Sequence, residues 1–193
     1  MLDGLIPYGK MKHALDLGCG IGRNSIYLLS KGVDVDAIDF SESALDEFRK
    51  TLEKLRISAG VRIIKHNLLE PIPINDSTYD LIIDFYNFCQ FISTEERHRY
   101  LNDVLRLLKP NGYAVFALFS LEDEYYNRFL PQSGDRVVDD PANHVISRLY
   151  SKQEVLELLS MFCNPYFITF EFDDIMQGIS FRRVIYILVL KRR

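Results

Sequence analysis

Three glycines at alternate positions constrain this chain more than any other feature of its sequence. In "ALDLGCGIGRNSIYLL", residues 14–29, they are Gly18, Gly20 and Gly22, and one acid, Asp16, interrupts the apolar run before them. Glycine costs stability inside regular structure, so this spacing indicates a turn with an unusual backbone conformation or a close approach by a ligand. A strand, a glycine-rich turn and a helix in this order form a phosphate cradle or another site where a ligand lies against the backbone.

The residues beside the glycines indicate which kind of ligand the turn accepts. A dinucleotide turn has the pattern G-x-G-x-x-G, and here Arg23 stands in place of its last glycine. The carboxylate of Asp16 would repel a pyrophosphate but suits a ligand with positive charge. Asp39 ends the next apolar run, 21 residues after Gly18, where an acid accepts hydrogen bonds from ribose hydroxyls in folds of this type. The turn is therefore predicted to bind a cationic or zwitterionic nucleoside rather than a diphosphate.

Short apolar runs alternate with amphipathic segments along most of the chain, which is typical of an α/β fold. We expect a doubly wound, mostly parallel seven-stranded sheet with helices on both faces, closed at one edge by an antiparallel pair from the C-terminal region. The five predicted parallel strands are residues 13–17, 33–39, 61–66, 79–84 and 113–119, and the antiparallel pair is residues 166–172 and 184–190.

Capping residues mark three of the predicted helices. Ser41 or Ser43 begins a helix that is expected to bury Leu45, Phe48, Leu52 and Leu55. A capping box of Ser93 and Glu96 begins a second helix, which should end at "KPNG", residues 109–112. A third helix follows Ser151 and is expected to extend to Met161.

Composition limits the setting in which this chain works. A length of 193 residues favours a single domain, residues 1–193, and a net charge of −4 argues against nucleic acid as a partner. The terminal "KRR", residues 191–193, is expected to be a solvated strand end. The three cysteines, Cys19, Cys89 and Cys163, are odd in number and form no C-x-x-C pair, which favours a reducing compartment. With no signal sequence and no apolar stretch of about 20 residues, a cytoplasmic protein without a membrane partner is expected.

Four blocks of sequence, in this order, resemble the class I S-adenosylmethionine-dependent methyltransferases. They are "LDLGCGIGRNS", "VDAIDFS", "NLLEPIPINDSTYDLIID" and "LLKPNGYAVF", and the resemblance covers about residues 12 to 120 in order and spacing. The "GRNS" ending and the segment "LYSKQEVLELLSMF" look most like the small-molecule branch that modifies tellurite and thiopurines. The resemblance implies S-adenosylmethionine as cofactor, a small-molecule acceptor and a monomer or homodimer, with no metal.

The resemblance also implies a role for individual residues. Asp39 would bind the ribose, Asn67 and Leu68 would read the adenine edge, and Asp84 would border the sulfonium end. Arg23 either meets the methionyl carboxylate or is a surface side chain. The complete set of cofactor-binding residues that the resemblance implies is Asp16, Gly18, Cys19, Gly20, Gly22, Arg23, Asp39, Phe40, Asn67, Leu68 and Asp84. Asp16 and the Gly18 carbonyl would face the methionyl amine, Gly20 and Gly22 would pass beneath the cofactor, and Phe40 would cover adenine.

Two departures from the family pattern concern the edge of adenine and the acceptor. The family usually has Asp where this chain has Asn67, which keeps an acceptor oxygen but loses a charge. The segment "DFYNFCQF", residues 84–91, lacks the Asn-Pro-Pro-Tyr of nucleic-acid amino methyltransferases.

A polar segment, residues 121–150, follows the last predicted parallel strand and should emerge at the carboxyl edge of the sheet, where ligands bind. It is either a mobile acidic loop or a lid that forms the acceptor pocket. As a lid, it would offer Tyr125, Tyr126, Arg128 and His144 to the acceptor, with the tyrosine hydroxyls in water. His144 in this segment and Tyr86 after the fourth strand are the candidate catalytic residues, although a soft acceptor needs no general base.

Other classes of function remain open. A regulatory protein that senses the nucleoside without catalysis would keep the glycine turn and Asp39. An aminopropyltransferase would need an acid-rich polyamine pocket, which "LEDE", residues 121–124, and "DD", residues 139–140, leave open. A nicotinamide-dependent oxidoreductase is disfavoured by the glycine spacing and Asp16.

Overall fold

A computed structural model describes residues 5–176 and 178–193 of the chain. Its elements follow one another in the order η2 Tyr8–Lys10, β1 His13–Leu17, α1 Arg23–Ser30, β2 Asp34–Asp39, α2 Glu42–Leu55, β3 Val61–Lys65, β4 Tyr79–Phe85, η3 Phe88–Gln90, α3 Thr94–Leu107, β5 Leu108–Phe119, α4 Glu124–Asn127, β6 Val137–Asp139, β7 Ile146–Arg148, α5 Lys152–Leu158, β8 Cys163–Met176 and β9 Ile179–Lys191. No helix in these two ranges is long and apolar enough to cross a membrane.

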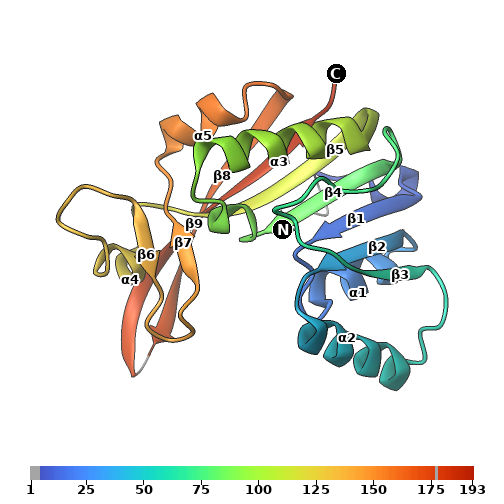
Figure 1. Cartoon of the computed structure of the whole chain (residues 1–193), viewed down its shortest axis with the longest axis horizontal. Coiled ribbons are helices and arrows are strands. Elements are labelled where there is room, and N and C mark those ends of the chain that lie inside the picture. Colours follow the sequence, from blue (N-terminus) through green and yellow to red (C-terminus); the bar gives the residue numbers. More distant parts are fainter. Residues whose placement is uncertain (1–4, 177) are drawn as a thin grey trace.

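Seven strands form one sheet in the order β3-β2-β1-β4-β5-β9-β8. The first five are parallel, β9 pairs antiparallel with β5, and β8 pairs antiparallel with β9 (Figure 1). The strand order reverses between β1 and β4, so the carboxyl ends of these strands flank a crevice. The predicted sheet and its antiparallel edge are confirmed.

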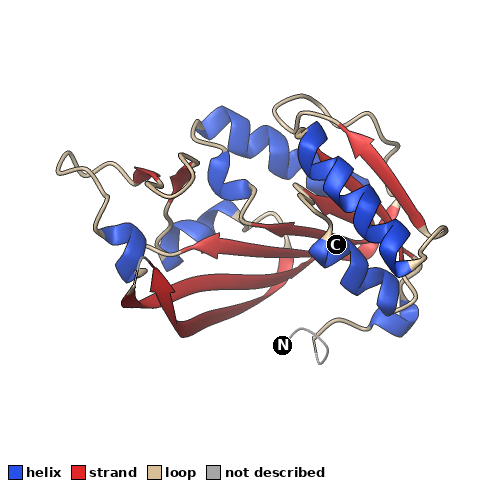
Figure 2. Ribbon diagram, turned by 90° about the horizontal axis from the view of Figure 1, so that it is seen from below, coloured by secondary structure: helices blue, strands red, loops and turns tan. Residues whose placement is uncertain are grey.

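Helices cover both faces of the sheet, each over its own apolar layer (Figures 1 and 2). On one face α3 and α5 contribute Leu101, Val104 and Val155, which are fully buried. On the other face α1 and α2 contribute Leu28 and Phe48, packed against the inward side chains of β1, β2 and β4. This alternation of layers confirms the doubly wound arrangement.

The predicted caps are present, but the burial of one residue and the ends of two helices differ from expectation. Ser41, Ser93 and Ser151 each accept a hydrogen bond from the backbone three residues on, and Ser93 forms the complete capping box with Glu96. Leu55 is 53% exposed because it lies in the last turn of α2, beyond the core. Helix α3 ends before "KPNG", which belongs to β5, and α5 ends at Leu158 rather than Met161.

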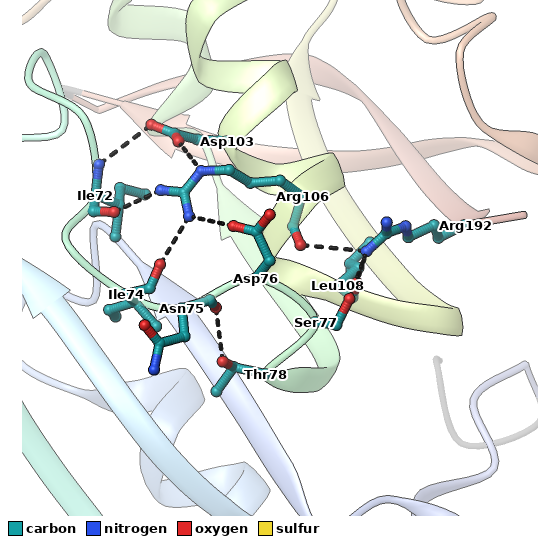
Figure 3. Close-up of polar contacts among 10 residues, drawn as sticks. All are labelled: Ile72, Ile74, Asn75, Asp76, Ser77, Thr78, Asp103, Arg106, Leu108 and Arg192. Carbon is teal, nitrogen blue, oxygen red and sulfur yellow. Dashed lines mark hydrogen bonds and ion pairs between the residues drawn. The ribbon is translucent and has the colours of Figure 1, made fainter.

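Two arginines fix the long connection between β3 and β4, as Figure 3 shows. Arg106 on α3 donates hydrogen bonds to the Ile74 carbonyl (2.7 Å) and to Asp103 (2.7 Å), and it also contacts the Ile72 carbonyl and Asp76. Arg192 donates to the carbonyls of Arg106 and Leu108 and to the hydroxyl of Ser77 (3.1 Å). The expectation of a solvated "KRR" end is therefore wrong for Arg192, because the carbonyls freed where α3 meets β5 need donors.

Residues 121–150, called the wing below, contain α4, β6 and β7 and lie beside the extended ends of β8 and β9, away from the parallel strands (Figure 1). Tyr125, Val138 and Leu149 are buried there against Phe181 of β9, so the wing has an apolar core of its own. Asp123 binds Arg183 of β9 through Oδ2 and Nε (2.8 Å). Asp140 accepts hydrogen bonds from both Tyr125 (3.2 Å) and Tyr126 (3.1 Å). The expectation of water-exposed tyrosine hydroxyls is wrong, since a buried carboxylate holds both.

Candidate functional site

The glycine turn joins β1 to α1 and lies against the end of β2. All three glycines have positive φ, between 53° and 80°. A Cβ on Gly22 would lie 2.1 Å from the Phe48 ring, so this glycine makes room for the packing of α1 on α2, and its predicted place beneath the cofactor stays a prediction. A Cβ on Gly18 would lie 2.7 Å from the Asn87 Cβ, whereas one on Gly20 would meet nothing within 4 Å. Gly18 makes room for the segment after β4, and the open side of the turn is at Gly20.

Asp39 ties the turn to β2. Its carboxylate accepts hydrogen bonds from the backbone amides of Gly20 (2.8 Å) and Ser41 (2.8 Å). Each oxygen takes one amide, and a carboxylate oxygen has capacity for a further bond. Asp39 therefore shapes the turn and still offers acceptor capacity to the crevice beside it.

A cavity of about 340 Å³ opens where the carboxyl ends of β1, β2, β3 and β4 meet. Five residues predicted to bind the cofactor line it, namely Gly18, Asp39, Phe40, Asn67 and Leu68. Among the described residues, no lysine, arginine or histidine lines this cavity. Its remaining lining residues, which the sequence analysis did not assign, are Leu69, Phe85, Asn87, Gln90 and Phe91.

The side of the cavity lined by Phe40, Asn67 and Leu69 has an apolar and a polar component. Phe40 is 68% exposed and Leu69 is 45% exposed, so two large apolar side chains of the lining keep a substantial free surface. Asn67, in the same lining, accepts a hydrogen bond from the Leu69 amide (3.0 Å) through its side-chain oxygen. This arrangement suits a planar ring that stacks on apolar groups and presents polar atoms at its edge.

Two predicted residues, Asp16 and Asp84, are buried beneath the cavity and do not line it. Asp16 accepts a hydrogen bond from the Ser25 hydroxyl (2.6 Å). Burial, together with the negative charges of Asp84 and Asp39, raises the pKa of Asp16 to about 7. Burial raises the pKa of Asp84 to about 6, although Tyr100, the Phe88 amide and Asn87 all donate hydrogen bonds to it. Both acids accept hydrogen bonds, but among the described residues neither has a cationic side chain in contact, so a cation nearby would favour their charged forms.

Cys19 and Arg23, also predicted to bind the cofactor, lie outside the lining. The Cys19 thiol is buried and donates to the Gly20 carbonyl (3.7 Å). Burial raises the pKa of this thiol, so it does not act as a nucleophile near neutral pH. Arg23 is exposed at the first position of α1, beside the glycine turn.

The two candidate catalytic residues are not brought together. Tyr86 follows β4 directly, between Phe85 and Asn87 of the cavity lining, with a left-handed φ of 72°. Its ring stacks on Phe119 at 4.6 Å, and burial raises its pKa. The side chain of His144 is 82% exposed between β6 and β7, with Nδ1 3.4 Å from Asp139. Its role stays a prediction.

The other wing residues proposed for the acceptor have different surroundings. The rings of Tyr125 and Tyr126 pack at 5.2 Å from one another, and the Tyr126 ring lies 4.6 Å from Phe119. An aromatic row thus connects Tyr86 at the end of β4 to the core of the wing. Arg128 is exposed, with its guanidinium 5.1 Å from the Phe181 ring.

The fold and this cavity together define a Rossmann-like class I methyltransferase architecture, and comparison with known proteins agrees. The family described as "Methyltransferase domain" matches residues 14–112, from β1 into β5. The chain belongs to this methyltransferase-domain family. The matched range contains every residue of the cavity lining and excludes the wing.

The similar proteins are named as methyltransferases, and each extends well beyond the part that this chain matches. Thiocyanate methyltransferase 1 of Brassica oleracea is 29% identical over 61% of this chain and 50% of its own length. The probable S-adenosyl-L-methionine-dependent methyltransferase TehB of Haemophilus influenzae is 29% identical over 56% of this chain and 37% of its own. The chain thus matches about half or less of these relatives.

Solved structures share the fold over nearly the whole chain. A methyltransferase from Methanosarcina mazei has a TM-score of 0.75 at 21% identity and covers 93% of this chain and 92% of its own. A 1,6-didemethyltoxoflavin-N1-methyltransferase of Burkholderia thailandensis, solved with its substrate and S-adenosylhomocysteine, has a TM-score of 0.70 at 21% identity, covering 95% and 72%.

Proposed function

We propose that this protein transfers a methyl group from S-adenosylmethionine to a small-molecule acceptor. The observation that supports this most is the composition of the cavity: a nucleoside-sized space with no basic side chain among its described lining residues, above two buried acids. A pyrophosphate would need donors and positive charge there. An ammonium and a sulfonium need the opposite, so the charges present fit S-adenosylmethionine.

The residues present also fit the separate parts of this cofactor. Asp39 is suited to accept hydrogen bonds from the ribose, and Phe40 with Leu69 is suited to hold the two faces of adenine. Asn67 and Leu68 lie where the adenine edge would be read. Asp16 and Asp84 would act on the methionyl end through their charge, from beneath the lining, rather than by direct contact.

When bound, S-adenosylmethionine supplies a methyl group on a sulfonium, which a nucleophile displaces in line. The protein contributes mainly by aligning the reactants and excluding water, which lowers such barriers by about 7–11 kcal/mol. The aromatic row from Tyr86 through Phe119 to Tyr126 provides an apolar wall next to the end of β4. Because burial raises the pKa of Tyr86, its hydroxyl stays protonated and is suited to orient the acceptor rather than to take its proton.

The wing is proposed as the wall of the acceptor pocket within one domain, residues 1–193. A role for His144 as a base requires the β6–β7 turn to approach the cavity, since its side chain lies in solvent. We further propose a cytoplasmic monomer or homodimer that does not act on nucleic acid, in line with the net charge and with Cys19, Cys89 and Cys163 being unpaired.

An aminopropyltransferase is less well supported. Its polyamine site would need free acids, but in "LEDE" Asp123 binds Arg183, and Glu124 lies near Arg182. In "DD" the carboxylate of Asp140 is occupied by two tyrosines. A non-catalytic sensor would keep the whole cavity and is distinguished only by turnover.

A screen with methyl-labelled S-adenosylmethionine tests the proposed activity. The purified protein is incubated separately with a metabolite extract, with tRNA and with heat-treated lysate protein, and label in each fraction is counted. We expect label in small molecules, with Tyr86→Phe slowing transfer to an identified acceptor. Label mainly in tRNA or protein would contradict the acceptor class, and binding of the nucleoside without any transfer would favour the sensor.

A further inference from the structure

Asn87 lines the cavity but has no role in the function derived so far. It follows β4 by two residues, in a half-buried position, and it lies against the glycine turn. A Cβ on Gly18 would come within 2.9 Å of the Asn87 Cγ and 3.0 Å of its Oδ1. The amide group of Asn87 therefore occupies the space that a larger residue at position 18 would fill.

The orientation of this amide is fixed by two buried partners. Nδ2 donates to the carboxylate of Asp84 (3.3 Å) and to the hydroxyl oxygen of Tyr100 (3.2 Å). The Tyr100 hydroxyl in turn donates to Asp84 (2.5 Å), so its own hydrogen is not available to Asn87. The opposite amide orientation would turn a carbonyl oxygen toward a carboxylate, which is repulsive. Only the nitrogen can face this pair.

The same arrangement turns the side-chain oxygen of Asn87, a lining residue of the cavity, away from Asp84 and Tyr100 and places it next to Gly18. Both Nδ2 hydrogens are used, and among the described residues no hydrogen bond reaches Oδ1. Asp84 is fully buried and Tyr100 is 1% exposed, so the support of this amide is rigid and dry. An amide oxygen in this setting is a strong acceptor for an N–H group, and most of all for a charged one.

We propose that Asn87 Oδ1 accepts a hydrogen bond from the ammonium group of the methionyl part of the cofactor, with Asp84 and Tyr100 as positioning residues that aim it. This inference rests on the proposed function. The location beside Gly18 selects the methionyl end, since Phe40, Asn67 and Leu68 line the adenine end. The Gly18 carbonyl and the Asn87 side chain would then hold the ammonium from two sides.

Calorimetric binding of two nucleosides tests the contact. S-adenosylhomocysteine carries the methionyl ammonium, whereas 5′-methylthioadenosine keeps the adenosine and the sulfur but lacks the amino-acid part. Asn87→Leu, which is similar in size, is expected to weaken S-adenosylhomocysteine binding by about 10- to 100-fold and to change 5′-methylthioadenosine binding by less than about twofold. Asn102→Leu, an exposed substitution of the same kind on α3, is the matched control and should change neither.

The positioning role has a separate readout. Tyr100→Phe removes one hydroxyl and keeps the ring, and it is expected to weaken S-adenosylhomocysteine binding about three- to tenfold in the wild-type background. In the Asn87→Leu background its effect should be clearly smaller, because the Tyr100 hydroxyl then acts only through the charge of Asp84 and no longer through the orientation of Asn87. Tyr150→Phe serves as control, since this tyrosine is also fully buried, stacks on the Phe88 ring and donates to the Phe88 carbonyl (3.5 Å) rather than to Asp84.

Each outcome decides between the two proposals. If the wild-type protein binds neither nucleoside, both the proposed function and this inference fail. If it binds both, and Asn87→Leu leaves S-adenosylhomocysteine unchanged or weakens the two nucleosides equally, the inference alone is overturned. An equal effect of Tyr100→Phe in both backgrounds would overturn the positioning role.

Discussion

The cavity region and the wing of this molecule differ in the partners of their buried acids. Beneath the cavity, Asp16 and Asp84 are buried, and no cationic side chain in the described part of the chain contacts either of them. In the wing, Asp123 is paired with Arg183, whose guanidinium also lies about 5 Å from two tyrosine rings. A buried charge without a partner costs stability, whereas a paired one contributes to a defined structure. The difference is consistent with the proposal that the cavity binds a cationic ligand, whereas the buried acid Asp123 of the wing already has its cation in Arg183 of β9.

Breaking the buried ion pair of the wing should give the largest effect. Arg183→Met leaves the Asp123 charge buried without a partner, and we expect a loss of about 3–5 kcal/mol in the free energy of unfolding. Arg182→Met is the matched control, because the neighbouring arginine forms exposed pairs with Glu124 and Glu171 that contribute at most about 1 kcal/mol. Urea unfolding measures both, and equal losses would mean that the wing is not held by this pair.

A substitution in the glycine turn tests the packing of the cavity region. Gly22→Ala places a Cβ 2.1 Å from the Phe48 ring at a left-handed φ of 80°, and we expect a loss of about 3 kcal/mol. Gly32→Ala has a similar φ of 77° but open space around it, so only the backbone cost of about 1–2 kcal/mol remains. If both variants unfold at the same urea concentration, the close approach of α1 and α2 has no energetic consequence.

Removing the charge at the end of β2 should weaken nucleoside binding. Asp39→Asn loses the charge-assisted acceptor proposed for the ribose, and we expect binding of S-adenosylhomocysteine to weaken by about 1.5–3 kcal/mol. Asp34→Asn changes an exposed acid at the opposite end of the same strand and should leave affinity unchanged. Calorimetry measures both affinities. Equal affinities of the Asp39 variant and the wild type would contradict the proposed hydrogen bonds between Asp39 and the ribose.

The pH dependence of stability provides the smallest effect and addresses the buried acids directly. The pKa of Asp16 is about 7 in the folded protein against an ordinary value of 3.8, so the folded state holds this proton more tightly. Its stabilising contribution is complete below about pH 4 and is lost as the pH rises through 7. Asp16→Asn cannot titrate, and it should therefore lose about 1–2 kcal/mol less stability than the wild type between pH 5 and pH 8.

The control for this pH series is Asp135→Asn, an exposed acid in the wing. Its stability should follow that of the wild type at every pH. Parallel curves for the wild type and Asp16→Asn would show that Asp16 does not carry a raised pKa in the folded protein.

Patterns that are local in sequence predicted most of the fold. The capping box of Ser93 and Glu96 and the alternation of strands and helices depend on neighbours a few residues away. Both features could therefore be predicted from the sequence alone. Five residues of the cavity lining were among those predicted to bind the cofactor, namely Gly18, Asp39, Phe40, Asn67 and Leu68. Each lies at the end of a predicted strand or in the turn that follows it.

Residues whose role depends on distant partners could not be predicted in the same way. The orientation of Asn87 follows from Tyr100, thirteen positions further along the chain, and from the burial of Asp84. The hydroxyls of Tyr125 and Tyr126 looked free because their partner Asp140 comes after a long polar stretch. Arg192 looked solvated because nothing in "KRR" reveals the carbonyls that it meets at the end of α3.

The central claim is that the cavity accepts a cationic nucleoside and not a diphosphate, and calorimetry at pH 8 with S-adenosylmethionine, S-adenosylhomocysteine and NAD tests it most directly. At this pH Asp16 and Asp84, with pKa values of about 7 and 6, are ionised and attract a cation. We predict binding of both sulfur nucleosides, weaker binding of S-adenosylmethionine at pH 5.5 as protons compete for these acids, and no binding of NAD. Tight binding of NAD with no heat from either sulfur nucleoside would contradict the account.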